Sequence, residues 1–291
     1  MARSTEEKAA TGGPTAARDL AAPAAEEVHE RVQAQFGAAA EAYGTSLVHV
    51  DPAALQRVVE LAQPKKDDAA LDIATGAGNT ALALAPHVAR VIAYDLTQEM
   101  LRETRRNATS RGLTNVYTQR GPAEKLPFRD ASFDIITSRQ APHHFADIRA
   151  AVNEMARVAR RGARVVIVDS TAPPGYENDP SLAAQWDAIE KLRDPSHGRN
   201  YSPREWREMI EGAGLRVFAE ETGFATENGG PMSFHAWTRR IQTPPDDVAK
   251  LQHLFRTASP ALAKGLRIEI GAEDIGFCVP VVTIAAVKEK A

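Results

Sequence analysis

The chain has 291 residues, 43% of them hydrophobic and 25% charged, which is typical of a globular protein long enough for one large α/β domain with insertions. A formal net charge of -3 provides no basic surface for nucleic acid, so no nucleic-acid partner is expected. The single cysteine, Cys278, excludes an intramolecular disulfide and a cysteine-based metal cluster. No apolar run approaches the ~20 residues of a membrane span, so none is predicted.

Residues 1–27 are rich in Ala, Thr, Gly and charged side chains and nearly lack large apolar ones. They contain no apolar signal core, and acids such as Glu6 and Asp19 disfavour a transit peptide. We therefore expect a disordered tail and a cytoplasmic protein. A helical cover is expected next, at residues 28–64, where Pro64 closes an apolar stripe of helical spacing.

From residue 70 onward, short apolar runs alternate with amphipathic helices. Strands are predicted at residues 70–74, 91–94, 116–118, 133–137 and 165–168, and helices at residues 80–85, 98–111 and 148–160. Asp147 is expected to cap the start of the last helix and Gly162 its end. This alternation predicts a parallel sheet with helices on both faces and a core over residues 65–170.

The C-terminal part continues this core with two interruptions. A capping box from Ser202 to Glu205 begins a helix, and a strand follows, so residues 202–221 are assigned to the core. The final strand, at residues 277–287, is preceded by another strand at 267–270 rather than by a helix, so residues 267–291 are expected to end the core. The intervening segments fit no alternation and are interpreted as insertions over one edge of the sheet: residues 171–201 and 222–266.

A glycine-rich turn follows the first predicted strand. Gly76 and Gly78 allow the backbone to turn sharply and approach a ligand. Together with Ala81, and with Asp95 placed 19 residues after Gly76, they also fit the dinucleotide-binding fingerprint. The turn alone therefore leaves a nicotinamide-dependent oxidoreductase and a methyltransferase open.

Three features favour the methyltransferase. Asp72 lies in the last turn of its strand, where an acid suits a ligand with a cationic amino group. Residues 121–128 precede the fourth predicted strand with a Pro-Ala-Glu segment. The last two strands lack a crossover helix, which predicts that the final strand is antiparallel.

With these residues the chain resembles the class I S-adenosylmethionine-dependent methyltransferases over residues 36–288, and most closely the branch of the menaquinone and ubiquinone C-methyltransferases and their bacterial relatives. The residues that carry the resemblance are Asp72-x-x-Thr75-Gly76-x-Gly78, Asp95-Leu96-Thr97, Ala123-Glu124-x-Leu126-Pro127-Phe128 and His143-His144-Phe145. The resemblance implies a Rossmann-like, doubly wound, mostly parallel seven-stranded sheet with an antiparallel last strand. It also implies S-adenosylmethionine as cofactor and S-adenosylhomocysteine as product.

The resemblance further implies a role for each cofactor-binding residue. Residues around the methionine portion would be Asp72, Ala74, Thr75, Gly76 and Gly78. Asp95 would bind the ribose hydroxyls, and Leu96 would pack on adenine. Ala123 and Glu124 would lie at the adenine edge, with Ser138, Arg139 and Gln140 beside the sulfonium. Pro122 departs from the aspartate that many relatives place there.

A physical argument supports the same set. These polar residues and Asp169 each follow a predicted strand, and the carboxyl ends of parallel strands meet at one edge of a sheet, where ligands of such folds bind.

Histidines supply the candidate catalysts. His143 and His144 follow the fourth strand, and either could act as a general base or simply pack against the sheet. His197 lies near Asp194 and Arg199, a group that could orient an imidazole, bind an acceptor or form surface ion pairs.

Tyr43 and His49 are candidates for a lid that contacts substrate. The eight histidines show no metal-ligand spacing, so no metal is expected.

The predicted function is methyl transfer to a carbon or oxygen, rather than a nitrogen, of a small apolar or aromatic acceptor. The acceptor site is expected above the cofactor, between residues 40–49 and the insertions at 171–201 and 222–266. A non-catalytic cofactor-binding protein remains an alternative beside the oxidoreductase.

Overall fold

The structure, a computed structural model, describes residues 24–44, 50–227 and 229–289, with side chains from 38 to 44 left out. The expected N-terminal tail therefore lies almost entirely outside the described residues. Residues 25–27 of that tail are helical, because helix α1 (Ala25–Gly44) begins at Ala25. Its first turn contains Glu26 and Glu27, and acidic side chains there interact favourably with the helix dipole. Throughout these described ranges, no helix is both long enough and apolar enough to cross a membrane.

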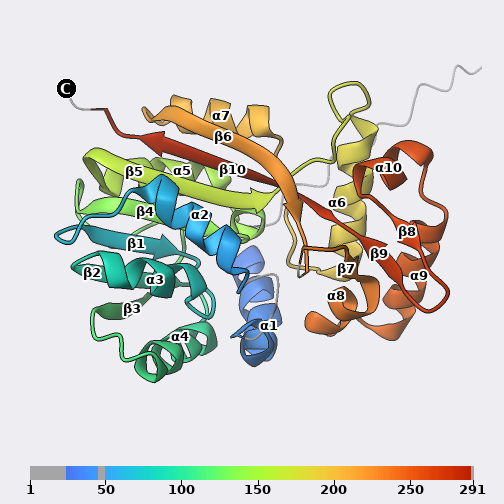
Figure 1. The fold of residues 1–291 in the computed structure, drawn as a ribbon, viewed down its shortest axis with the longest axis horizontal. Coiled ribbons are helices and arrows are strands. Elements are labelled where there is room, and N and C mark those ends of the chain that lie inside the picture. Colours follow the sequence, from blue (N-terminus) through green and yellow to red (C-terminus); the bar gives the residue numbers. More distant parts are fainter. Residues whose placement is uncertain (1–23, 45–49, 228, 290–291) are drawn as a thin grey trace, which may run out of the picture.

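A seven-stranded sheet forms the centre of the fold, in the order β3-β2-β1-β4-β5-β10-β6 (Figure 1). Its strands are β1 (Ala69–Ile73), β2 (Arg90–Asp95), β3 (Val116–Arg120), β4 (Phe133–Arg139), β5 (Ala159–Ser170), β6 (Arg216–Ala225) and β10 (Val279–Val287). Strands β1 to β5 pair in parallel, and β10 runs antiparallel to both β5 and β6. The predicted α/β class and the antiparallel last strand are thus confirmed.

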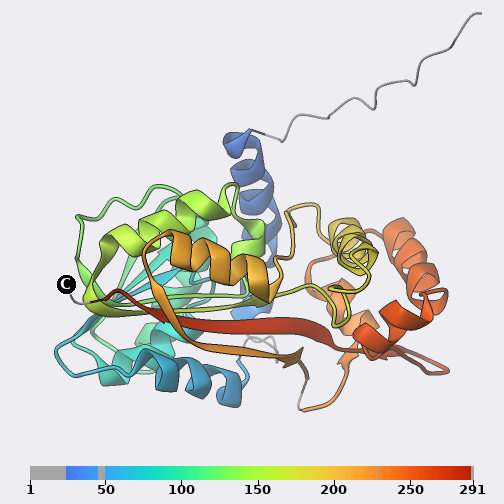
Figure 2. The ribbon, with the colours of Figure 1, turned by 90° about the horizontal axis from the view of Figure 1, so that it is seen from above.

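Helices cover both faces of the sheet (Figure 2). The helices of the core are α2 (Pro52–Ala62), α3 (Asn79–Leu84), α4 (Gln98–Ser110), α5 (Ile148–Val158) and α7 (Pro203–Gly212), with a short 3-10 turn η1 (Ala85–His87). Helices α5 and α7 bury apolar side chains on one face, including Met155 and Trp206. Helices α2 and α3 do the same on the opposite face with Val58 and Leu84. Burial of these stripes is the main source of stability.

Two predicted helix boundaries had different outcomes. Asp147 caps α5 as predicted, since its carboxylate accepts a hydrogen bond from the Ala150 backbone N–H. The prediction that Gly162 ends this helix is wrong, because α5 ends at Val158 and the chain enters β5 at once. Gly162 lies within that strand, where its N–H donates to the Lys288 carbonyl at 2.6 Å. Backbone pairing with the C-terminal segment therefore replaces the last predicted turn of helix.

The two interrupting segments, together with residues 269–277, build a second, smaller body, here called the lobe, on the right of Figure 1. Residues 269–277 pair in a separate three-stranded sheet, so their expected assignment to the core is wrong. Its elements are α6 (Ser181–Arg193), β7 (Met232–Ser233), α8 (Phe234–Arg240), α9 (Pro245–Arg256), α10 (Pro260–Gly265), β8 (Glu269–Ile270) and β9 (Ile275–Phe277). The lobe has its own apolar core, in which the Trp186 and Trp237 rings stack with their centroids 6.3 Å apart. Strands β9 and β10 are separated by Cys278 alone, so the lobe continues directly into the sheet.

Strand β6 is longer than predicted, and it corrects the boundary expected at residue 222. It runs to Ala225, which pairs with Val279 of β10, so residues 222–225 belong to the sheet. Backbone pairing between β6 and β10 therefore continues past the acidic residues Glu220 and Glu221, near which the sequence predicted that β6 would end.

Helix α1 lies between the sheet and the lobe, and it contacts both α4 and α8 (Figure 1). The Gln33 side chain donates to the Leu96 carbonyl at 3.3 Å, on the side of the sheet. The Gln35 side chain donates to the Ile241 carbonyl at 2.9 Å, on the side of the lobe. The predicted helical cover therefore connects the two bodies.

Candidate functional site

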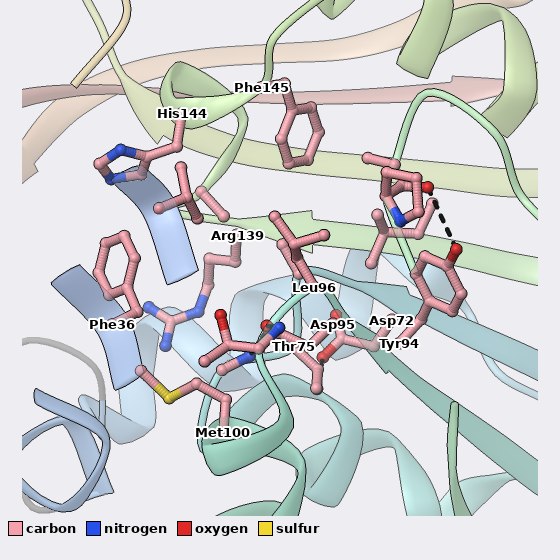
Figure 3. Close-up of a pocket in the computed structure, with 18 of the residues that line it drawn as sticks. Phe36, Asp72, Thr75, Tyr94, Asp95, Leu96, Met100, Arg139, His144 and Phe145 are labelled. Atoms are coloured by element: carbon pink, nitrogen blue, oxygen red, sulfur yellow. Dashed lines mark hydrogen bonds between the residues drawn. The ribbon is translucent and has the colours of Figure 1, made fainter. Parts of the chain in front are cut away.

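The first cavity opens at the carboxyl ends of β1, β2 and β4, beside α1 (Figure 3). Its lining includes most of the predicted cofactor-binding residues: Asp72, Ala74, Thr75, Gly76, Asp95, Leu96, Ala123, Glu124, Arg139 and Gln140. The topology brings these residues together because each follows a parallel strand. Two predicted residues, Gly78 and Ser138, do not line it.

Gly76 and Gly78 have different functions in the turn after β1. Gly76 has φ +56°, and a Cβ added there would meet no atom within 4 Å, so its Cα faces open space beside the cavity. Gly78 has φ +91°, and its Cβ would lie 2.8 Å from Thr104 Cγ2 on α4. Gly76 therefore permits close approach of a ligand, whereas Gly78 permits close packing of two helices.

Ser138 lies in β4, and its side chain is 1% exposed. Its hydroxyl has no hydrogen-bond partner among the described residues, and it faces neither cavity. The structure therefore does not place this hydroxyl beside a sulfonium.

Asp72 is a buried carboxylate at the base of the first cavity, 1% exposed. It accepts hydrogen bonds from the Thr75 and Thr137 hydroxyls, both at 2.6 Å, and from the Ala81 N–H at 3.2 Å. Burial raises the pKa of Asp72 above its ordinary value, although these hydrogen bonds oppose the shift. A cationic group bound here would stabilise the charged form.

Asp95 ends β2, and its carboxylate organises two loops. One oxygen accepts from the Gly76 N–H and the other from the Thr97 N–H, both at 2.8 Å. Burial is the largest cause of a pKa raised to about 6. Each carboxylate oxygen still has a lone pair available, so both can accept from the vicinal hydroxyls of a ribose.

The segment after β3 forms the far wall of the first cavity. The Tyr94 hydroxyl donates to the Pro122 carbonyl at 3.1 Å, and a side chain at Gly121 would collide with the Tyr94 hydroxyl. Glu124 accepts from the Ala146 N–H at 2.7 Å. Pro122 is thus part of a rigid wall, and Glu124 fastens it to the loop before α5.

Sequence reasoning missed the contribution of α1 to this cavity. His29, Val32 and Phe36 line one side of it, and His29 Nε2 lies 3.2 Å from a Glu124 oxygen. The Phe36 ring meets the His144 ring edge-on, with centroids 4.9 Å apart. The one sequence signal for this contribution was an aromatic residue, Phe36, in the predicted cover helix.

A second cavity lies between the sheet and the lobe. It shares Gln140 and His144 with the first cavity, so the two are adjacent. The remaining lining residues come from the turn after β4, from β5, from α6 and its C-cap, from the β6–α8 region and from β10: His143, Ser170, Glu190, Arg193, Asp194, Ala225, Met232, Trp237, Arg240, Val279 and Val281. Its walls therefore combine apolar and charged side chains.

His143 and His144 lie side by side in the 3-10 turn η2 (Pro142–His144), but their surroundings differ. His143 Nδ1 lies 2.6 Å from Asp169 Oδ1. Burial alone would lower the His143 pKa, but the charge of Asp169 outweighs it and raises the pKa. His144 Nδ1 lies 3.0 Å from the Ser196 carbonyl, and burial beside His143 lowers its pKa to about 3.

The expected cluster of His197, Asp194 and Arg199 does not form. His197 is buried with its Nε2 3.3 Å from Asp187 on α6, and it lines neither cavity. Arg199 points outward, forms an ion pair with Glu205 and does not line a cavity, which corrects its assignment to the substrate. Glu205 belongs to the capping box of α7, so its ion pair holds the Arg199 guanidinium at the start of that helix.

Asp194 does line the second cavity, where it accepts from the Ser196 N–H at 2.9 Å and hydroxyl at 2.6 Å. The side chain of Tyr43 and the whole of His49 lie outside the described residues.

The fold and the first cavity fit S-adenosylmethionine. S-adenosylmethionine is a nucleoside that carries an amino acid. Asp95 at the end of β2 suits its ribose, Asp72 suits its amino group, and the open space at Gly76 lets the ligand approach the backbone. Together they define a class I S-adenosylmethionine-dependent methyltransferase.

Comparison with known proteins agrees. Residues 71–167 match the family described as "Methyltransferase domain". An uncharacterized methyltransferase, YcgJ of Bacillus subtilis, is 35% identical over 257 residues, 87% of this chain and 97% of that protein. Its crystal structure gives a TM-score of 0.74 at 34% identity, covering 82% of this chain and 99% of that chain. A putative methyltransferase from Bacillus halodurans gives 0.75 at 28% identity, covering 82% and 100%.

A demethylmenaquinone methyltransferase from Thermus thermophilus is 38% identical over 121 residues, 41% of this chain and 54% of that protein. The chain belongs to the class I S-adenosylmethionine-dependent methyltransferases, with S-adenosylmethionine as methyl donor and S-adenosylhomocysteine as product. This membership sets aside the oxidoreductase and the non-catalytic alternatives.

Proposed function

We propose that the chain transfers the methyl group to a carbon or oxygen atom of a small apolar or aromatic acceptor bound in the second cavity. One observation carries this proposal: the second cavity adjoins the first through Gln140 and His144. A donor in one cavity and an acceptor in the other would meet at these two residues, as an in-line displacement requires.

The orientation of the donor is supported by the lining of the first cavity. Asp72 and Thr75 would hold the methionine portion, Asp95 the ribose and Leu96 one face of adenine. When bound, the donor supplies an electrophilic methyl group on a sulfonium. The methyl group would then point past Gln140 towards the second cavity.

The acceptor class is supported by the walls of the second cavity. Trp237, Met232 and Val281 provide apolar surface, and Trp237 is 2% exposed and fixed in the core of the lobe. A rigid aromatic wall suits a planar or apolar acceptor, and the Thermus relative is named for a methyl transfer to demethylmenaquinone. Holding donor and acceptor in line can lower the barrier by about 7–11 kcal/mol.

The test separates donor binding from acceptor binding. Titration calorimetry with S-adenosylmethionine and S-adenosylhomocysteine measures the first, and transfer from labelled donor to a panel of small phenols, quinols and enols measures the second. Ala225→Phe fills the second cavity and should abolish transfer while leaving donor affinity unchanged. Unaltered transfer by this variant would contradict the proposed acceptor position.

A further inference from the structure

We propose that His143, oriented by Asp169, accepts the proton released during methyl transfer, and that the acceptor is therefore a phenol or an enol that reaches the enzyme with its hydroxyl proton. This inference rests on the proposed acceptor position in the second cavity and specifies its chemistry. It assigns a role to two buried groups that donor binding does not use.

The geometry of the pair fixes which ring nitrogen is available. His143 Nδ1 lies 2.6 Å from Asp169 Oδ1, so Asp169 holds this nitrogen as the N–H donor. No described residue hydrogen-bonds to Nε2, and His143 is part of the second cavity's lining. The neutral ring therefore presents a lone pair on Nε2 towards a bound acceptor.

A proton on the His143 ring stabilises the buried Asp169 carboxylate. Its side chain is 0% exposed, and its Oδ2 has no hydrogen-bond partner among the described residues. A buried carboxylate with one bare oxygen is costly, and a neighbouring imidazolium reduces that cost. The same arrangement orients the histidine and stabilises its charged form in Ser-His-Asp hydrolases.

Other charged groups around His143 act in both directions. Arg193 and Arg240 line the same cavity and disfavour a proton on the ring, but they form ion pairs with Glu190 and Glu227. The titratable groups that face it are Asp169 on β5, Glu190 on α6, Asp194 after α6, His144 in η2 and His197 before α7. The three acids favour the protonated ring, and His144 stays neutral with a pKa of about 3. The Nδ1 partner of His144 is the neutral Ser196 carbonyl, which does not balance a charge on the ring as the Asp169 carboxylate does, so His144 is the weaker base.

The step balances without another reactant. A lone pair of the acceptor oxygen forms the bond to the methyl carbon, the carbon–sulfur bond breaks, and its electron pair stays on sulfur. The hydroxyl proton passes to Nε2 of His143, so the positive charge lost by the sulfonium appears on the imidazolium. In an enol, attack by the conjugated carbon moves the same proton and leaves a carbonyl group.

The first experiment measures the pair without turnover. Ring carbons of histidine are labelled, His143 is assigned with His143→Gln, and the S-adenosylhomocysteine-bound protein is titrated by NMR. We expect a His143 pKa above the ordinary value of 6.5, and a fall of about one unit or more in Asp169→Asn. A pKa at or below 6.5 that Asp169→Asn leaves unchanged would overturn the inference.

The second experiment uses 4-nitrophenol, whose ionised form has its own visible absorbance. Added to the S-adenosylhomocysteine-bound protein below its own pKa, the bound probe should show the phenolate spectrum, because its proton moves to His143. His143→Gln should lose this signal, and the exposed-residue control His253→Gln should keep it. Absence of the phenolate signal in the wild type, or its persistence in His143→Gln, would refute the inference.

Turnover separates this inference from the proposed function. With any phenol that the wild type methylates, His143→Gln should lose about 10²- to 10⁴-fold in kcat near neutral pH. The loss should shrink as pH approaches the phenol pKa, because the acceptor then ionises in solution; a purely structural defect would not follow pH in this way. A uniform loss at every pH would refute the base while leaving the proposed function intact, whereas unaltered transfer by Ala225→Phe would refute the acceptor position itself.

Discussion

Donor affinity should depend on pH through Asp95. In the ligand-free protein, burial holds the pKa of this carboxyl at about 6. Ribose hydroxyls donate to the ionised form, since both oxygens already accept backbone N–H groups and only lone pairs remain. The donor therefore binds the deprotonated state, so affinity rises with pH up to about 6 and levels off above it.

The magnitude follows from the fraction that is ionised. With a pKa of about 6, roughly one protein in eleven has Asp95 ionised at pH 5, against about nine in ten at pH 7. The dissociation constant should rise about tenfold from pH 7 to pH 5. Calorimetry with S-adenosylhomocysteine in buffers of different ionisation enthalpy also measures the expected release of a proton at pH 5.

Asp95→Asn is the matched control. The amide group must turn its NH2 towards the N–H of either Gly76 or Thr97, which leaves a buried donor unsatisfied at a cost of about 1–3 kcal/mol. The variant should bind the product weakly and with a much flatter pH profile, and any slope that remains belongs to Asp72, whose pKa is also raised by burial. The reasoning is refuted if wild type and Asp95→Asn show the same slope between pH 5 and pH 7.

Three further predictions concern packing and specificity. Gly76→Ala should weaken donor binding, because its Cβ enters open space at the cavity, with a modest loss of stability from its φ of +56°. Gly78→Ala combines a φ of +91° with a collision with Thr104, so it should lower the melting temperature more. Equal effects of both variants on calorimetric affinity would contradict this division. Trp237→Ala should cost about 3–5 kcal/mol in the lobe, measured by urea unfolding, and a loss below 1 kcal/mol would mean that the site collapses around the gap. Arg199→Ala should leave donor binding and methyl transfer unchanged, and a loss of transfer would restore this residue to the substrate site.

The sheet and most of the donor site could be predicted because their signals are local. Asp72, Gly76 and Asp95 each lie at the end of an apolar strand, and the strand ends of a parallel sheet meet by topology alone. Gly78 shows the limit of that reasoning. Its place in the motif is correct, but which side of the turn its Cα faces depends on Thr104, a residue of another helix.

The lobe could not be predicted, because its core is assembled from distant parts of the chain. Trp186, Trp237 and Phe277 lie in three separate segments of the chain, and their rings meet only when α6, α8 and β9 pack together. For the same reason, nearness in sequence misled us about His197. It is three residues from Asp194, yet its ring turns back to Asp187 on the preceding helix.

Strand β10 determines how the two cavities are placed relative to each other. Within the sheet its register pairs Val281 with Ser170 and Val282 with Asp169, and Val279 and Val281 line the second cavity. At its start, only Cys278 separates β10 from β9, whose Phe277 packs in the core of the lobe with Trp237. One continuous stretch of chain therefore fixes the apolar wall of the second cavity against the carboxylate that orients His143. The lobe can consequently vary its side chains, and so the acceptor it admits, without moving the proposed base away from the methyl group.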